Sequence, residues 1–194
     1  MNKAILPLLL ALALPACQSQ PAAEPPLAGA RIGGPFTLTD QDGRMRTDSM
    51  FAGQYRLMYF GYTFCPDVCP VDMQKLMQGY ALLEKSDPAK AAKLAPIFVT
   101  VDPKRDTVPV IKQFVTAFHP KLIGLTGPET EIAAVAKRYA IIYQAQPPAT
   151  PGAAYLVDHS RQAMLFGPKG EPIALIPQDG TAQEIEAELA KWIA

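Results

Sequence analysis

The chain has 194 residues, 49% of them apolar, with 18 basic and 18 acidic side chains. This apolar content is typical of a globular protein and excludes a disordered chain, which combines low hydrophobicity with high net charge. Because the charges balance, the chain lacks the basic surface of nucleic-acid-binding proteins, and nucleic acid is not expected as a partner. Apart from about thirty N-terminal residues that are expected to form a signal and a linker, about 160 residues remain for folding, the usual size of one domain.

The N-terminus predicts an export signal and a lipid anchor. An uncharged stretch, Ala4 to Ala16, follows the basic residue Lys3, and it is shorter than the about 20 residues of a membrane-spanning helix. Leu14-Pro15-Ala16-Cys17 resembles a bacterial lipobox. We therefore expect cleavage before Cys17, acylation of this cysteine and anchoring on the periplasmic side of a bacterial membrane. The alternative is an ordinary secretory signal followed by an incidental cysteine.

Three segments are expected: a signal peptide at 1–16, the lipidated cysteine with a flexible linker at 17–30, and a folded domain at 31–194. The linker is rich in Pro and Ala and has no apolar periodicity, as is typical of an extended, solvated spacer. Acylation uses the odd cysteine, so Cys65 and Cys69 remain as a pair in an oxidising compartment.

The folded segment begins with a predicted β-hairpin. Residues 36–39 and 44–47 flank Asp40-Gln41-Asp42-Gly43, whose Asp-Gly step favours a turn. The apolar run at 56–61 does not alternate with polar residues, which predicts a strand covered on both faces. Apolar residues then recur at helical spacing from Val71 to a break at Ser86-Asp87-Pro88, which predicts a helix.

Strands and helices alternate through the rest of the chain. The predicted strands are 94–101, 122–125, 141–144, 154–157, 163–167 and 172–176, and the predicted helices are 107–118, 129–139 and 181–193. This alternation predicts an α/β domain with helices on both faces of a sheet.

Cys65 and Cys69 lie between the strand at 56–61 and the helix that follows it. A spacing of four residues on a first helical turn places both side chains on one face. The helix N-terminus favours thiolate over thiol, and thiolates bind metal ions and attack disulfides. The pair can therefore be a dithiol, a disulfide or a metal site, and a structural disulfide across so short a loop would add little stability.

The mature chain carries two histidines. His159 follows a predicted apolar strand, where α/β sheets present functional residues, although a solvated loop histidine is an equal alternative from the residues alone. His119 stands near a helix end, where a solvated or helix-capping role is expected. Structural zinc sites take four ligands, and such a site would need His119 as well.

Two thiolates and one imidazole form a soft ligand set that suits copper, either Cu(I) or Cu(II). Met73 and Met77 follow the cysteines at helical spacing, but a stripe of methionines on a helix more often fills the core. We expect both to be core residues.

The run from Gly61 to Pro70, GYTFCPDVCP, resembles the signature of the Sco/SenC family of copper chaperones of cytochrome oxidase assembly. The resemblance covers about residues 33–192, with further blocks in family order at 34–38, 98–107, 124–127 and 155–160. It implies a thioredoxin-like fold with an added N-terminal β-hairpin, and a copper site in which His159 joins Cys65 and Cys69. Asp158 is expected to orient His159.

The chain departs from the family pattern at Phe64, where many relatives carry His. This difference leaves the three ligands untouched, and we expect it to alter solvent access to the site. The segment 147–152, PPATPG, is expected to form a mobile loop over the site.

The resemblance implies delivery of copper to the dinuclear copper centre of cytochrome c oxidase subunit II, with another periplasmic copper chaperone or a thioredoxin-like reductase as a further partner. The alternative is a thiol:disulfide oxidoreductase that reduces the copper-ligand cysteines of the target through Cys65 and Cys69. Dedicated enzymes of that type use Cys-x-x-Cys, and exchange alone does not need His159. A thiol peroxidase would need an Arg and a Thr around an activated cysteine, and we do not identify such a set of residues in the sequence.

Overall fold

The computed structural model describes residues 24–148, 150 and 152–194. The expected signal peptide, Cys17 and positions 18–23 of the linker lie outside these residues, as do positions 149 and 151 of the expected loop. Among the described helices, none combines the length and the apolar character needed to cross a membrane. Residues 24–30, expected as linker, include a turn, and the N–H of Leu27 donates to the carbonyl of Ile173 at 3.0 Å.

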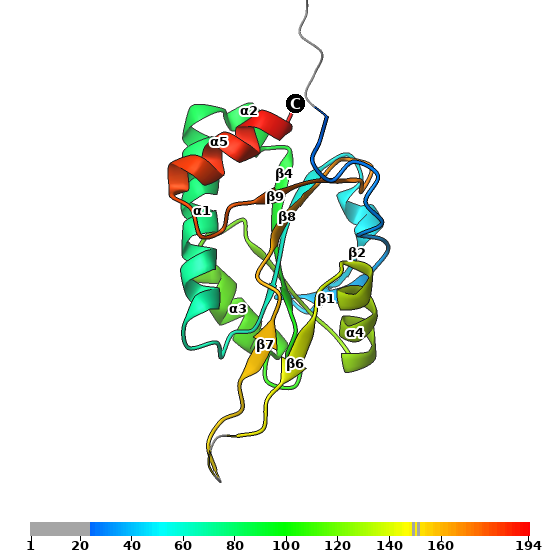
Figure 1. Ribbon diagram of the computed structural model, residues 1–194, viewed down its shortest axis with the longest axis vertical. Coiled ribbons are helices and arrows are strands. Elements are labelled where there is room, and N and C mark those ends of the chain that lie inside the picture. Colours follow the sequence, from blue (N-terminus) through cyan, green and yellow to red (C-terminus); the bar gives the residue numbers. More distant parts are fainter. Residues whose placement is uncertain (1–23, 149, 151) are drawn as a thin grey trace, which may run out of the picture.

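A seven-stranded mixed sheet forms the centre of the fold (Figure 1). In spatial order its strands are β2 (Met45–Thr47), β1 (Thr37–Asp40), β5 (Ile123–Thr126), β4 (Leu94–Thr100), β3 (Tyr55–Gly61), β8 (Ala163–Phe166) and β9 (Pro172–Ile176). The neighbours β3, β4 and β5 run parallel, and the other pairs are antiparallel. Every residue of β3 and β4 is buried, which explains their unbroken apolar sequence.

Helices cover both faces of the sheet, as predicted. They are α1 (Val68–Ser86), α2 (Pro88–Ala91), α3 (Val108–Thr116), α4 (Glu129–Arg138) and α5 (Ala182–Trp192), with a 3-10 helix, η1, at Asp48–Phe51. Figure 1 shows α1, α3 and α5 on one side and α4 on the other. Adjacent residues of β3 face these two layers in turn. The Tyr59 ring lies 6.5 Å from Phe98, which packs on α3, and the Phe60 ring lies 5.5 Å from Tyr139 at the end of α4.

The predicted N-terminal hairpin is confirmed. Strands β1 and β2 pair antiparallel, and β1 also pairs with β5 at the edge of the sheet. Asp40 fixes the turn, because its Oδ1 accepts the N–H groups of Asp42 and Arg44, each at 2.9 Å. Gly43 has a φ of 76°, a left-handed conformation that glycine adopts without strain.

The strands predicted at 141–144 and 154–157 are displaced, and they lie outside the central sheet. The structure has β6 (Tyr143–Ala145) and β7 (Val157–His159), which form an antiparallel ribbon and pair with no other strand of the described chain. This ribbon projects at the bottom of Figure 1. Its apolar residues misled the prediction, because Leu156 is 49% exposed and covers no core. His159 is thus the last residue of a ribbon strand, not a residue that follows a strand of the sheet.

Candidate metal centre

The buried strand β3 leads directly to the cysteines. Helix α1 begins at Val68, three residues earlier than the predicted start at Val71. Cys65 therefore lies in the loop before the helix and only Cys69 lies in its first turn, so the expectation that both share a helical turn is wrong. Asp67 makes no side-chain bond as the N-cap, and the N–H of Cys69 donates instead to Cys65 Sγ at 3.4 Å.

The ribbon places the His159 imidazole against Cys69, with Nε2 at 3.0 Å from Sγ. The other ring nitrogen, Nδ1, is 2.9 Å from the Ser160 carbonyl oxygen. A carbonyl only accepts hydrogen bonds, so Nδ1 carries the proton and the lone pair of Nε2 faces the cysteines. The rings of Tyr59 and Tyr62 meet the imidazole edge-on, at centroid distances of 6.3 and 5.9 Å, and restrict its rotation.

The ligand atoms of Cys65, Cys69 and His159 all lie within 4.8 Å of one another. Within the part of the chain that the structure describes, this is the one group of three or more His, Cys, Asp or Glu side chains arranged to hold a metal ion. Both cysteines are free thiols. Two sulfurs and one imidazole nitrogen suit copper, whereas a structural zinc site takes four protein ligands.

The other candidate ligands lie elsewhere. His119 is half-buried, with Nε2 at 3.1 Å from a Glu84 carboxylate oxygen and Nδ1 accepting the N–H of Lys121 at 3.2 Å. It is thus a side chain paired with an acid, rather than a solvated or helix-capping residue as predicted. Met73 and Met77 are 1% and 2% exposed, and the prediction that they fill the core is confirmed.

The two thiols differ in environment. Burial raises the pKa of Cys69, which is fully buried. Burial alone would also raise the pKa of Cys65, but hydrogen bonds from the backbone of Cys69, Asp67 and Val68 outweigh it and hold the pKa below the ordinary value. Burial lowers the pKa of His159, so near pH 7 the imidazole is neutral, the form that binds metal.

Asp158 does not orient His159 as expected. Adjacent residues of a strand point to opposite faces, and the Asp158 carboxylate accepts a hydrogen bond from Gln146 Nε2 at 2.7 Å on the exposed face. The Ser160 carbonyl holds the imidazole instead.

A buried polar network behind Cys69 was not predicted. Asp72, 1% exposed on the inner side of α1, accepts the Tyr59 hydroxyl at 2.8 Å. It also accepts Arg161 Nη2 and Nε at 2.8 and 3.1 Å. The network joins β3, α1 and the segment just after His159, so it braces the elements that carry the ligands. An acidic residue on the apolar face of a predicted helix was the signal in the sequence.

Arg105 forms a clamp on the other side of the ribbon. Its guanidinium donates to the Asp102 carboxylate and, at 2.8 Å, to the carbonyl of Tyr155, two residues before β7 of the ribbon. The guanidinium carbon also lies 3.6 Å from the centroid of the Tyr155 ring and 5.1 Å from that of Phe64. Phe64 itself is 51% exposed. Arg105 therefore ties the ribbon with His159 to the loop with Cys65.

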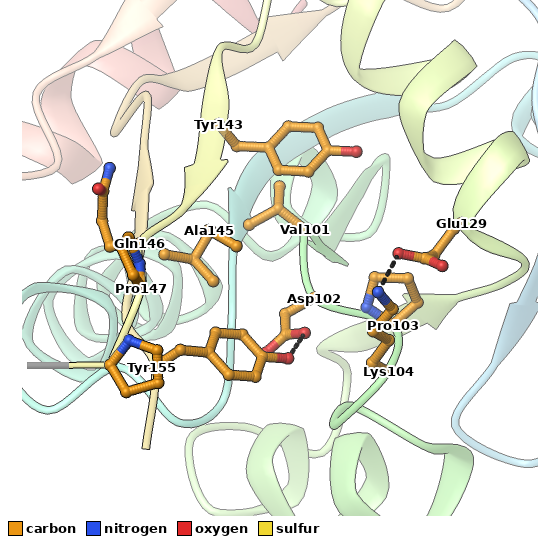
Figure 2. A pocket seen from close by; sticks show the side chains of 12 residues that line it. Val101, Asp102, Pro103, Lys104, Glu129, Tyr143, Ala145, Gln146, Pro147 and Tyr155 are labelled. Carbon is orange, nitrogen blue, oxygen red and sulfur yellow. Dashed lines mark hydrogen bonds and ion pairs between the residues drawn. The ribbon is translucent and has the colours of Figure 1, made fainter. Parts of the chain in front are cut away.

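A cavity of about 350 Å³ adjoins this clamp (Figure 2). Figure 2 shows the Tyr155 hydroxyl, which donates to Asp102 at 2.7 Å, and the ion pair of Lys104 with Glu129 at 3.1 Å. Cys65 and His159 do not line this cavity; they open into a separate depression of about 280 Å³. An incoming ligand can reach the metal site through that depression.

Fold and site together define a copper-binding protein with a thioredoxin-like fold. The chain belongs to the SCO1/SenC family, whose family model matches residues 24–194. It is 40% identical over 159 residues to the human mitochondrial protein SCO1 homolog, a match that covers 82% of this chain and 52% of that protein. It is 39% identical over 158 residues to protein SenC of Rhodobacter capsulatus, covering 81% and 69%. The chain thus spans about half the length of the human relative.

Solved structures support both the fold and the metal. Copper-bound ScoI of Bradyrhizobium japonicum superposes with a TM-score of 0.75 at 36% identity, covering 83% of this chain and 99% of that one. Copper-bound yeast Sco1 superposes with a TM-score of 0.76 at 32% identity, covering 84% and 88%. The predicted thioredoxin-like fold and the prediction of copper are confirmed.

Proposed function

We propose that this protein is a copper chaperone that carries one copper ion on Cys65, Cys69 and His159 and delivers it to the dinuclear copper centre of cytochrome c oxidase subunit II. The observation that carries the proposal is the convergence of the three ligand atoms within 4.8 Å beside a surface depression. Three ligands leave room for an incoming sulfur to bind copper before a resident ligand departs. The ion then passes by stepwise ligand exchange without becoming free.

The charge of the site suits both oxidation states of copper. Two thiolates and a neutral imidazole with Cu(I) carry one net negative charge, and with Cu(II) they carry none. The first turn of α1 holds Cys69 and directs its N–H groups toward Cys65, and a helix N-terminus stabilises negative charge.

We propose that export and acylation of Cys17 hold the folded domain at a membrane through the linker. The segment around Leu27 is bonded to Ile173 of β9, at the end of the molecule opposite the β6–β7 ribbon (Figure 1). A tether at that end leaves the metal site facing away from the membrane surface, toward the exposed domain of a partner. Another periplasmic copper chaperone would load the site.

The test is copper transfer to the copper-free soluble domain of subunit II, followed by the visible absorbance of the dinuclear centre. The copper-loaded chain is compared with a small chelator that buffers the same total copper at the same free concentration. We expect faster metallation from the chain, because direct ligand exchange bypasses free copper. Equal rates from chain and chelator would show that copper passes through solution, and would contradict a chaperone.

A second function, reduction of the disulfide in subunit II, is favoured by the contrast between the two thiols. Cys65 is partly exposed and can attack a disulfide sulfur, while Cys69 is fully buried beside it. In this reaction Cys65 forms a mixed disulfide with one partner sulfur and releases the other as a thiol. Cys69 then attacks the Cys65 sulfur and displaces the partner sulfur that is bonded to it, so the partner gains two electrons and two protons while Cys65 and Cys69 become a disulfide.

This second function is tested by mixing the copper-free, reduced chain with oxidised subunit II domain and counting the partner's thiols. The variant Cys69→Ser should trap the mixed disulfide at Cys65, since the resolving thiol is gone. A thioredoxin-like reductase would regenerate the chain. Unchanged partner thiols, with no trapped species, would exclude the reductase and leave the chaperone standing.

A further inference from the structure

A second polar site lies at the end of the sheet opposite the metal centre. A cavity of about 220 Å³ opens between the start of the domain, the 3-10 helix η1 and the turn that joins β8 to β9. Its lining includes Gly34, Pro35, Ser49, Arg56, Lys169 and Gly170. Arg56 is the second residue of β3, the strand whose other end leads to the cysteines.

Arg56 is a buried cation that forms no ion pair with any carboxylate in the described part of the chain. It is only 5% exposed, and its Nε has no hydrogen-bond acceptor among the residues that the structure describes. In the same residues the ion pairs of arginine involve Arg44, Arg46, Arg105 and Arg161, and none involves Arg56. Its guanidinium carbon lies 5.7 Å from the centroid of the Phe166 ring, which offsets only part of the charge.

The surrounding turn leaves space for the guanidinium. A Cβ on Gly170 would lie 2.8 Å from Arg56 Nη2, and the φ of Gly170 is +86°, so glycine suits this position on both counts. Lys169 supplies a second cation to the lining and Ser49 a hydroxyl. Among the described residues that line the cavity, Asp48 is the one acid, and its Oδ1 accepts the N–H of Phe36 at 3.2 Å. Two cations against one carboxylate leave the cavity positive.

We propose that this cavity binds a small oxyanion of the phosphate type, held by the guanidinium of Arg56. A guanidinium pairs with two oxygens of such an anion at once, while Lys169 and Ser49 offer donors at the lining. The bound anion compensates a charge that is costly to bury alone. A volume of 220 Å³ is several times the ~30 Å³ share of one water molecule, so phosphate fits with part of its hydration.

Two sources supply this chemistry: inorganic phosphate and the headgroup of an anionic phospholipid. The segment around Leu27 enters the fold at the same end of the molecule as this cavity, since it is bonded to Ile173 of β9 (Figure 1). If the proposed acylation of Cys17 holds, that end faces the membrane and a headgroup is within reach. The oxyanion site itself does not depend on the anchor.

The experiment uses the unacylated, copper-free chain in two arms. The first titrates inorganic phosphate at constant ionic strength, following the thermal midpoint and the NMR signal of the Arg56 Nε–H. The second measures cosedimentation with vesicles of phosphatidylglycerol and with vesicles of phosphatidylcholine. The variant is Arg56→Met, and the control is Arg44→Met, which removes an arginine that is 71% exposed. Copper binding reports that each variant is folded.

In the wild type we expect one of two responses. Either the thermal midpoint rises with phosphate and saturates, or the chain binds vesicles of phosphatidylglycerol and not those of phosphatidylcholine. Response to phosphate identifies the free ion as ligand, and response only to the vesicles identifies the headgroup. Arg56→Met should lower the affinity at least about tenfold while Arg44→Met keeps it. Without phosphate, Arg56→Met should be as stable as the wild type or more so, because the unpaired charge is gone. No response in either arm, or an equal response of Arg56→Met, would overturn the proposal.

Discussion

Replacing Arg105 with methionine tests whether the clamp stabilises the ribbon that carries His159. The change removes the donor to Asp102, which is 4% exposed, and the donor to the Tyr155 carbonyl. Of the side-chain donors in the described residues, Asp102 then keeps the Tyr155 hydroxyl alone, at 2.7 Å. Removing one partner of a buried ion pair costs about 3–5 kcal/mol, and because Arg105 is itself 17% exposed we expect the lower end, about 3 kcal/mol.

The assay is urea unfolding of the wild type, Arg105→Met and the matched control Lys104→Met. Lys104 is the neighbouring residue, and its ion pair with Glu129 is 67% and 62% exposed, so its loss should cost below about 1 kcal/mol. A double variant, Arg105→Met with Asp102→Asn, should recover part of the loss because no unpaired charge remains.

Copper affinity provides the second readout of the clamp. A ribbon that is held less firmly spends time with His159 away from the cysteines, so Arg105→Met should also bind Cu(I) more weakly than Lys104→Met. The reasoning is refuted if Arg105→Met loses no more free energy of unfolding than Lys104→Met. Lost stability with unchanged copper affinity would refute the link to the ribbon.

Three further predictions concern thiol reactivity, acid stability and helix packing. Iodoacetamide should modify Cys65 at least about tenfold faster than Cys69 in the copper-free, reduced chain. Cys65 is partly exposed and its pKa is lowered, whereas Cys69 is buried and its pKa is raised. Equal modification rates, followed by mass spectrometry, would contradict this prediction. Burial alone would raise the pKa of Asp40, but hydrogen bonds from its turn and from an arginine side chain outweigh burial and lower the pKa. The Asp40 carboxylate therefore stabilises the fold above about pH 4. This stabilisation is lost as the pH falls through the lower pKa of the folded state. Urea unfolding between about pH 5 and 2 should therefore show a steeper acid loss for the wild type than for Asp40→Asn, and parallel curves would disprove it. In Gly79→Ala the new Cβ would lie 2.4 Å from Ile185 Cγ2. An overpacking cost of about 1–3 kcal/mol should exceed the gain in helix propensity of up to about 1 kcal/mol, so the variant should be less stable than the wild type. A higher thermal midpoint of Gly79→Ala would count against the packing argument.

The cysteine pair was predictable because its signal is local. An unbroken apolar run at 56–61 predicts a buried strand, and a helical pattern follows at once, so the residues between them lie at the carboxyl end of the sheet. The start of α1 at Val68 was missed, since Cys65 and Cys69 at a spacing of four also fit a helical turn. The same spacing of four residues therefore fits two cysteines on one helical turn, and it also fits one cysteine in the loop before the helix and one in its first turn.

His159 was singled out as a ligand only through the family resemblance. Its neighbours at 155–157 are apolar like a strand of the sheet, yet Leu156 is half-exposed on a separate ribbon. The error over Asp158 has the same origin, because strand alternation turns it away from His159. Which face of the β6–β7 ribbon meets the metal site depends on how the ribbon packs against the rest of the fold. The local pattern of apolar residues does not determine this packing.

Asp72 and Arg105, which brace the site, stand out at their own positions in the sequence, but the sequence does not indicate which residues they pair with. Asp72 stands on the apolar face of a helix, and Arg105 follows the carboxyl end of a buried strand. Asp72 pairs with Arg161, 89 residues further on, and Arg105 with Tyr155, 50 residues further on. Such long-range pairings are set by the packing of the ribbon on the sheet, so one sequence alone does not specify them.

The most direct test of the copper site is an anaerobic titration of the reduced chain with Cu(I) against a competing chelator. Wild type, His159→Ala and His119→Ala are compared, so that the control removes the other histidine of the mature chain, which is paired with Glu84. We predict one-to-one binding that His119→Ala preserves. His159→Ala should weaken it more than about tenfold, since even the partners of metal ligands contribute that much. Equal affinity of wild type and His159→Ala would contradict the site.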